Sequence, residues 1–464
     1  MKEFDKFISS PLFGCKNFVI RFFKEIKKHY PEFSPDDIEK EKIFKKLYGS
    51  KKYNDGLVRR MTSDLMRMSE DFMMYSSFRA TESFRNVCFL HELRLRKLDD
   101  IFLIKSGRLL SEIKNSSIDN LSLMNKFFIE NQRINLFIKG KENMLLESLF
   151  AGSDALIGFF LSALNNKTQV IHGRRRATKT GTEPVLYDNF MKHFDYPGYI
   201  KSIETVDTAE AFFLKANYYF HLMSIDKDDV ESYQKCRQLV HTDSTHLRDV
   251  SRQNYILSLA NFCSGQVMDN NYDYLDEYFY NIEIILKENL FLSNATVISP
   301  GIIRRIILFS MIQKQAGYIE NFVKDYSKYF NPMHKDDLIN YCNAAVHFVN
   351  KDFGKALEHS SMITHLPSEF IKDIKILKIK IFYILNYSDS FISEIDSFRH
   401  YLSTENGFNE RNILKGRNFI KFILKLSKLR DNRLATDLSV LIREIMDEDK
   451  INEKLWLVES ANEL

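Results

Sequence analysis

Apolar side chains recur every three or four residues along most of the chain, which is the spacing of one face of an α-helix. The clearest run extends from Leu57 to Phe78 and is formed by Leu57, Met61, Leu65, Met68 and Phe72, with charged residues between them. This pattern predicts one long amphipathic helix. The same spacing predicts helices from Lys16 to Tyr30, where Pro31 follows, and from Phe84 to Leu103.

The sequence Ser-Pro-Asp-Asp that begins at Ser34 carries the signals of a helix start. Serine accepts hydrogen bonds from the first free N–H groups of a helix, and Pro35 suits the first helical position. The two aspartates place negative charge in the first turn. We therefore expect a helix from Ser34 to about Tyr48.

The apolar spacing stops between residues 165 and 186, where the chain is polar and contains Gly173, Gly181 and three consecutive arginines. We interpret this segment as a basic loop or linker between an N-terminal helical domain, residues 1–164, and a second domain, residues 187–464. In the second domain the helical spacing returns in pairs of segments. The expected pairs are 208–224 with 228–241, 245–265 with 272–288, and 300–316 with 319–330.

The segment from Tyr341 to Ile363 has the features of two helices packed closely together. Ala344 and Ala356 are small residues twelve positions apart, and Phe353 stands before the second helix. This pattern resembles a tetratricopeptide repeat, a helix-turn-helix unit of about 34 residues whose small residues let its two helices approach. The resemblance implies an all-α fold. An N-terminal helical domain would be followed by a right-handed α-solenoid of antiparallel helix pairs, as in bacterial helical-repeat proteins.

The next unit, Glu369–Leu402, keeps the length of two helices but has Lys378 and Glu394 near the places where such repeats have small residues. We therefore expect a tetratricopeptide-like array rather than a regular one. The last predicted helix, Asn452–Ala461, contains the only tryptophan of the chain, Trp456, and is expected to cap the stack.

Composition favours long helices and a large core. The chain has 16 Gly and 8 Pro in 464 residues, so few positions favour tight turns, and 39 Phe with 22 Tyr provide core volume. The net charge of +4 is too small to predict nucleic-acid or membrane binding from overall charge. The most apolar stretch, Leu149–Leu164, contains Asp154 and is expected to be too short to span a bilayer.

The cysteines indicate a reducing compartment. They lie far apart and form no CxxC pair: Cys15, Cys88, Cys236, Cys263 and Cys342. An odd number of dispersed cysteines is typical of buried thiols rather than of a disulfide framework. Because the first residues also lack an apolar leader, we expect a cytoplasmic protein that does not enter a membrane.

The strongest local charge signal is the basic segment formed by Arg174, Arg175, Arg176 and Lys179. Guanidinium groups bind phosphate or carboxylate through paired hydrogen bonds, so this segment is a candidate anion- or nucleic-acid-binding site. The alternative is a solvated loop, or one that pairs with acidic residues of the same protein. We favour this alternative, because a single basic run is common in proteins.

A calcium site is partly matched after residue 268. Asp269, Asn271 and Asp273 have the spacing of the first three ligands of an EF-hand. However, Tyr274 occupies the position that needs Gly, and Tyr280 the position that needs Glu. The pattern therefore predicts no calcium site.

A second candidate metal site is formed by His241, Asp243 and His246 at a corner between two predicted helices. Polar helix caps explain the same residues, so we expect no metal there. No nucleophile motif, dinucleotide fingerprint or paired CxxC occurs in the chain. The sequence therefore predicts no catalytic residue, no metal and no cofactor.

These observations favour a non-enzymatic protein–protein interaction scaffold that binds a protein or peptide partner on its solenoid. The alternative is a nucleic-acid- or anion-binding regulator. The segment Asp37–Phe72, with Arg59 and Arg60 near the start of its second helix, is similar to the helix-turn-helix portion of bacterial winged-helix regulators. No alternating strand pair follows Phe72, so the sequence lacks the wing of that family.

If the basic segment binds phosphate, replacing Arg174, Arg175 and Arg176 by alanine will weaken retention on heparin or nucleic acid with little change in folding. Each lost phosphate contact will reduce the slope of log K against log salt by roughly 0.7–0.9, because fewer counterions are released. Equal retention of the wild-type and triple-variant proteins at low salt would show that these arginines bind no nucleic acid.

Overall fold

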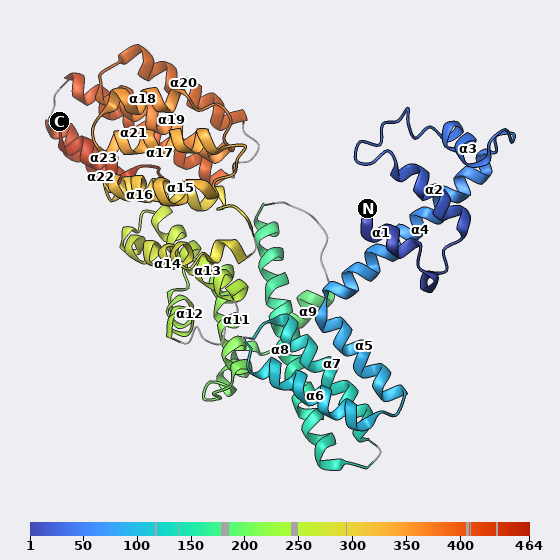
Figure 1. The fold of residues 1–464 in the computed structure, drawn as a ribbon. Helices are drawn as coiled ribbons and strands as arrows, with labels where there is room; N and C mark the ends of the chain where they lie inside the picture. Colours follow the sequence, from blue (N-terminus) through green and yellow to red (C-terminus); the bar gives the residue numbers. More distant parts are fainter. Residues whose placement is uncertain are drawn as a thin grey trace. The chain divides into compact units, whose positions relative to one another are not determined.

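The structure is a computed structural model of the chain, and it describes all residues except 117, 139, 178–184, 243–248, 294, 405–407, 409 and 433–434. In the described residues it is 80% helical, with 23 α-helices and no β-strand (Figure 1). The prediction of an all-α fold is confirmed.

The chain forms two compact units. The first contains Met1–Glu112 with Asn125–Ser153, and the second contains Ile113–Met124 with Asp154–Leu464. The sequence placed the boundary between residues 164 and 165, eleven residues after the point where the main body of the second unit begins.

The helices of the first unit, some long and some short, pack against one another through aromatic side chains. Its helices are α1 (Lys2–Ile8), α2 (Asn17–Lys27), α3 (Lys40–Tyr48), α4 (Asp55–Ala80), α5 (Glu82–Leu95) and most of α6 (Asp99–Lys114), with parts of α7 (Asn120–Phe137) and α8 (Glu142–Ala177). Phe4 of α1 meets Phe23 of α2 edge to face, with ring centroids 4.9 Å apart. On the other side of α2, Phe22 packs with Phe44 of α3 and Met61 of α4. The apolar face of α4 therefore packs into two small cores.

Two helix predictions in the first unit are wrong. The helix expected from Ser34 begins at Lys40, because the carbonyl of Ser34 closes a single turn with the N–H of Asp37 and the chain is extended again at Glu39. The helix expected from Phe84 to Leu103 is broken at Lys97, whose φ of 57° is left-handed. A left-handed residue ends a helix, and the next one starts at Asp99 with acidic residues in its first turn.

The second unit is a series of helix hairpins. Its helices are α9 (Val185–His193), α10 (Tyr196–Ser202), α11 (Ala209–Ile225), α12 (Val230–Thr242), α13 (Asp249–Met268), α14 (Leu275–Lys287), α15 (Pro300–Ile312), α16 (Ala316–Tyr326), α17 (Lys335–Val349), α18 (Phe353–Ser361), α19 (Ser368–Ile384), α20 (Ser388–Thr404), α21 (Glu410–Asn432), α22 (Ala435–Asp447) and α23 (Lys454–Asn462). These bounds agree with the predicted pairs to within a few residues.

Helices in this unit contact their neighbours, and some also contact the helix two positions away. Each of α15 to α22 contacts the next, α11 contacts α13, and α15 contacts α17 as α21 contacts α23. Between α14 and α15 the link is aromatic, with the rings of Tyr278 and Phe309 centred 4.7 Å apart. Such contacts are typical of stacked helix pairs.

The pair α17–α18 contains the alanines singled out in the sequence. Ala344 and Ala356 are fully buried in one apolar cluster with Leu377 and Ile381 of α19, and Phe353 packs against this cluster. The absence of a larger side chain at both alanines lets α17, α18 and α19 approach one another.

Helix α8 contradicts two predictions. The break expected from residue 165 is wrong, because α8 continues to Ala177 and so includes Arg174–Arg176 in its backbone. The prediction that the apolar stretch is too short to cross a membrane is also wrong. Among the described residues, Glu142–Thr168 is the one helical segment long and apolar enough to cross a bilayer, and a minority of it is buried.

Replacing Ala344 or Ala356 by leucine should lower the free energy of unfolding by about 1–3 kcal/mol, because no space exists for three further carbon atoms in the α17–α18–α19 cluster. Chemical denaturation followed by circular dichroism measures this change. Glu358→Leu, at an exposed position of α18, is the matched control and should change stability little. Equal midpoints for all variants would show that the alanines do not limit the helix spacing.

Candidate binding groove

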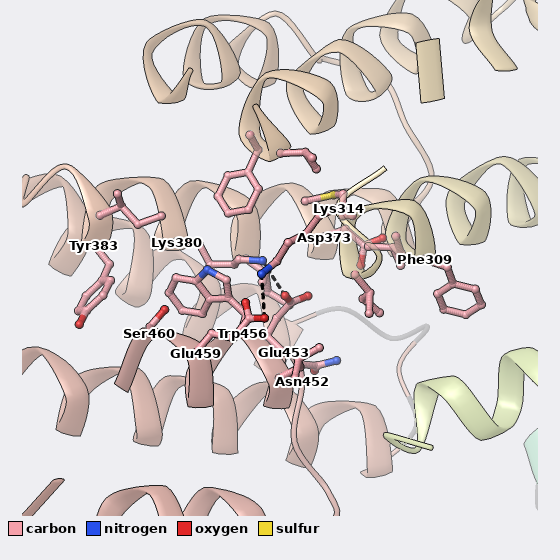
Figure 2. Close-up of a pocket in the computed structure, with 18 of the residues that line it drawn as sticks. Phe309, Lys314, Asp373, Lys380, Tyr383, Asn452, Glu453, Trp456, Glu459 and Ser460 are labelled. Atoms are coloured by element: carbon pink, nitrogen blue, oxygen red, sulfur yellow. Dashed lines mark hydrogen bonds and ion pairs between the residues drawn. The ribbon is translucent and has the colours of Figure 1, made fainter. Parts of the chain in front are cut away.

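The odd-numbered helices of the second unit line a cavity of about 570 Å³ (Figure 2). Each of α13, α15, α17, α19 and α21 supplies wall residues, among them Val267, Leu308, Phe348, Ile376 and Arg430. Of the even-numbered helices in the described chain, only α18 lines it, through Phe353. Apart from α17–α18, the hairpins that line the cavity therefore present one helix of each pair to it.

Helix α23 covers this cavity. One side of α23 belongs to the core, since Leu457 and Ala461 are fully buried in a cluster with residues of α19 to α22. Trp456 packs against the same cluster and lies edge to face with Tyr383 of α19, with ring centroids 5.9 Å apart. The predicted cap of the stack thus also forms a wall of the groove.

Lys380 joins α19 to the start of α23 (Figure 2). Its ammonium lies 2.6 Å from a carboxylate oxygen of Glu453, 5.0 Å from the Trp456 ring centroid and 4.6 Å from that of Phe348. Because the Lys380 side chain is only 5% exposed, its charge depends on Glu453 and on these two ring faces in place of water.

Arg304 of α15 and Asp373 of α19 form a second ion pair in the wall. Arg304 Nη2 donates to Asp373 Oδ1 at 2.9 Å, and Nε donates to Oδ2 at 2.5 Å. Burial disfavours the charged arginine, but the adjacent carboxylate outweighs burial and raises the pKa of Arg304. Next to Asp373, burial lowers the pKa of Lys372 to about 8, although Lys372 does not line the cavity.

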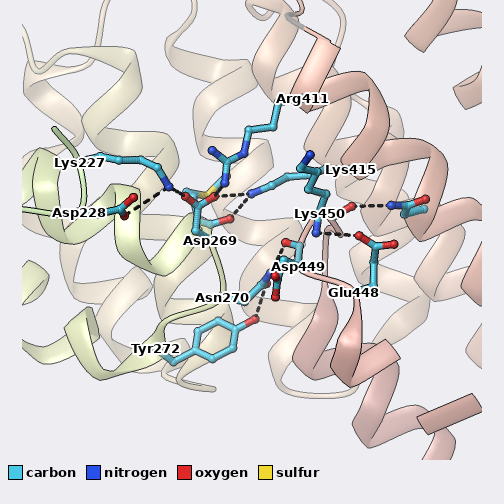
Figure 3. Close-up of polar contacts among 12 residues, drawn as sticks. Lys227, Asp228, Asp269, Asn270, Tyr272, Arg411, Lys415, Glu448, Asp449 and Lys450 are labelled. Atoms are coloured by element: carbon cyan, nitrogen blue, oxygen red, sulfur yellow. Dashed lines mark hydrogen bonds and ion pairs between the residues drawn. The ribbon is translucent and has the colours of Figure 1, made fainter. Parts of the chain in front are cut away.

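Asp269, just after α13, joins three segments of the second unit (Figure 3). It accepts hydrogen bonds from Lys227, which follows α11, at 2.5 Å, and from Arg411 and Lys415 of α21 at 2.6 and 2.9 Å. Burial raises the pKa of the Asp269 carboxyl, but hydrogen bonds from the two lysines and the charge of α21 outweigh it, so the pKa is lowered. Beside this contact, Asn270 donates to the carbonyl of Asp449 at 3.2 Å.

The partial EF-hand pattern is therefore explained by structure. Asp269 pairs with cationic side chains, and Asn271 stands before the short 3₁₀ helix that contains Asp273. Among the described residues, no three His, Cys, Asp or Glu side chains are grouped as metal ligands.

Of the other sequence candidates, the structure describes only His241 in full. His241 lies on α12 beside the Tyr280 ring, and burial lowers its pKa. Asp243 and His246 lie outside the described residues. The side chains of Arg174–Arg176, and the whole of Lys179, are also outside the part of the chain that the structure describes.

Sequence reasoning missed the groove. A signal was present in α19, where Lys372, Asp373 and Lys380 interrupt an isoleucine-rich helix on positions that prove to be buried. Charges on a buried helix face require partners, but their partners are 69 and 73 residues away in sequence. No local pattern identifies pairs at such distances.

Comparison with protein-family models, curated proteins and solved structures finds no match to this chain. We therefore infer the function from the geometry of the second unit.

We expect Asp269→Asn to lower the free energy of unfolding by about 1–3 kcal/mol near neutral pH, because it removes the charge partner of the buried Lys415. A carboxyl whose pKa is lowered by folding stabilises the protein above its unfolded pKa, and this stabilisation is lost as pH falls through the folded pKa. The difference between wild type and variant should therefore shrink below about pH 4.

Urea denaturation as a function of pH measures this effect. Asp228→Asn is the control, since Asp228 lies 3.5 Å from Lys227 but is largely exposed. A stability difference that does not change with pH, or an equal effect of both variants, would show that the charge of Asp269 does not stabilise the contact between α13 and α21.

Proposed function

We propose that the protein is a non-enzymatic interaction protein whose second unit is a tetratricopeptide-like α-solenoid, and that the groove lined by its odd-numbered helices binds a segment of a partner protein. The observation that carries the proposal is the way in which α23 lies on these helices. Its Trp456 contacts the Tyr383 ring, and Glu453 at its start pairs with Lys380.

The contacts of α23 indicate what the groove recognises. Glu453 precedes the first residue of α23, and Trp456 and Glu459 are spaced by three residues and so lie on neighbouring positions of one helix face. Glu459 pairs with Lys314 at 2.9 Å, in the turn between α15 and α16. The aromatic anchor Trp456 and its acidic neighbours are thus matched by Tyr383 and Lys380 of α19 and by Lys314 in the turn after α15, and helix-in-groove recognition works by such anchors.

The groove extends beyond the part that α23 covers. A cavity of about 570 Å³ remains between α23 and the ends of α13, α15 and α17. In this proposal a partner segment enters beside α23, and α23 supplies one wall of the site. The five cysteines are free thiols, which supports a cytoplasmic location for such a protein.

A second candidate function is the binding of an anion or nucleic acid by the basic segment or the first unit. Helices α2, α3 and α4 contact one another around a shared core, as in a helix-turn-helix arrangement. Arg60 of α4 is exposed, but Arg59 pairs with Asp55 at 2.6 Å. In the described residues α4 is followed by α5 and not by a strand pair, so this candidate ranks second.

A photoreactive amino acid placed at Ile384 should crosslink the partner in the native cell, whereas the same amino acid at Ile392 should not. Ile384 lines the groove at the end of α19, and Ile392 lies on the neighbouring helix α20 outside it. The two side chains are 37% and 49% exposed, so access to solvent does not favour the groove position. Mass spectrometry of the crosslinked products identifies the partner. The same products at both positions, or none at Ile384, would contradict the proposal.

A further inference from the structure

Helix α8 exposes large apolar side chains along one face. They are 40–68% exposed and recur at three- and four-residue spacing: Leu146, Leu149, Phe150, Leu156, Ile157 and Phe160. We call these six side chains the α8 stripe. A helix of a globular core does the opposite, because it buries its large apolar side chains.

The buried face of α8 consists mainly of small residues, among them Gly152, Ala155 and Gly158. A Cβ atom at Gly152 would lie 3.3 Å from Glu130 Cβ, and one at Gly158 would lie 3.2 Å from a methyl carbon of Leu123. Glu130 and Leu123 both belong to α7, so the small residues let α7 approach α8. The stripe lies on the other face, and a row of apolar side chains that the chain leaves exposed is typical of an interaction surface.

The stripe has the spacing of a coiled coil and ends in opposite charges. Steps of three and four residues run without interruption from Glu142 to Lys167, through positions 146, 149, 153, 156, 160 and 163. Such a repeat forms the seam between two packed helices. Glu142 and Lys167 are both exposed, and neither has an ion pair in the part of the chain that the structure describes. Each is therefore free to pair with a charge outside its own chain.

A second copy of α8 in antiparallel orientation matches the stripe. Because the two helices run in opposite directions, Glu142 of one copy can lie opposite Lys167 of the second. The midpoint of this register falls between residues 154 and 155, and it places Leu149 opposite Phe160 of the second copy. A two-fold axis repeats both pairings, so apolar residues fill the middle of the seam and an ion pair closes each end.

A lipid bilayer is the other surface that could cover the stripe, since Glu142–Thr168 is long and apolar enough to cross one. However, Glu147 and Asp154 are exposed within this segment. Both carboxylates would have to leave water inside a bilayer, which is unfavourable. Each directly follows a seam position, and a seam between two helices leaves such positions in water. The charges therefore favour a second copy over lipid.

We propose that the protein forms a homodimer in which the α8 stripes of two copies pack antiparallel, with Glu142 of each copy paired with Lys167 of the other. The contact uses α8 and not the groove of the second unit. It therefore holds or fails separately from the proposed partner protein.

Sedimentation velocity of the full-length chain at rising concentration tests the stripe. The wild type should sediment as a dimer, and Leu149→Lys should raise the dissociation constant at least about hundredfold, because it places a charge against Phe160 of the second copy. Leu292→Lys is the matched control, since Leu292 lies in the 3₁₀ turn Leu290–Ser293 and is 42% exposed, against 40% for Leu149. This control should dimerise as the wild type does. If Leu149→Lys loses its helical circular dichroism, Leu156→Lys takes its place.

A charge exchange tests the antiparallel register. Glu142→Lys or Lys167→Glu alone should raise the dissociation constant about tenfold, because two repulsive pairs replace two ion pairs. The double variant, Glu142→Lys with Lys167→Glu, should recover the wild-type value. In a parallel dimer each residue would face its own copy, so neither single change would weaken the contact.

Four results would overturn the proposal. The first three are a wild-type protein that stays monomeric at every concentration, a folded Leu149→Lys variant that dimerises as the wild type does, and a double variant that does not recover. The fourth comes from flotation with vesicles of phosphatidylcholine and phosphatidylglycerol. If the wild type floats with these vesicles as a monomer and Leu149→Lys does not, lipid and not a second copy covers the stripe.

Discussion

The carboxylate of Asp269 links parts of the second unit that a simple stack of helices would leave apart. It accepts a hydrogen bond from Lys227 in the turn after α11. It also accepts hydrogen bonds from Arg411 and Lys415 of α21, which are 142 and 146 residues further along the chain. In an array of helix pairs, each pair needs only its neighbours to bury its apolar face. The contact with α21 (Figure 3) therefore adds a constraint that packing of adjacent pairs does not supply, and both α13 and α21 line the groove.

Within the groove, specific charges define how α15, α19 and α23 meet. Arg304 with Asp373 and Lys380 with Glu453 are ion pairs between helices, and removal of water from both partners offsets much of their attraction. Their main contribution is to geometry, because a buried charge tolerates only the arrangement that provides its partner.

The start of α23 illustrates this constraint. Glu453 has a φ of 58°, a left-handed conformation that costs a residue with a side chain roughly 1–2 kcal/mol. In this conformation Glu453 reaches Lys380, and the helix that follows places Leu457 in the core and Trp456 toward Tyr383. The ion pair and the burial of Leu457 offset the backbone cost, so one helix completes the core and shapes the cavity.

The sequence by itself determined the fold class and most helices, because the three- and four-residue apolar spacing and the scarcity of Gly and Pro are local properties of the chain. It placed the hairpins from α11 to α16 to within a few residues and singled out Ala344 and Ala356, which are buried together.

Helix ends were less certain from sequence. The start near Ser34 was wrong because the carbonyl of Ser34 closes only a single turn. The break after residue 164 was wrong because α8 continues through polar residues, of which Asn165 and Thr168 are buried, and Lys97 ends a helix without glycine or proline. Only the tertiary structure decided which charges are buried, that Asp269 pairs with cations of two other segments, and that a cavity lies beneath Trp456. These features depend on pairs of residues more than forty positions apart, and such pairs meet only when the helices have packed.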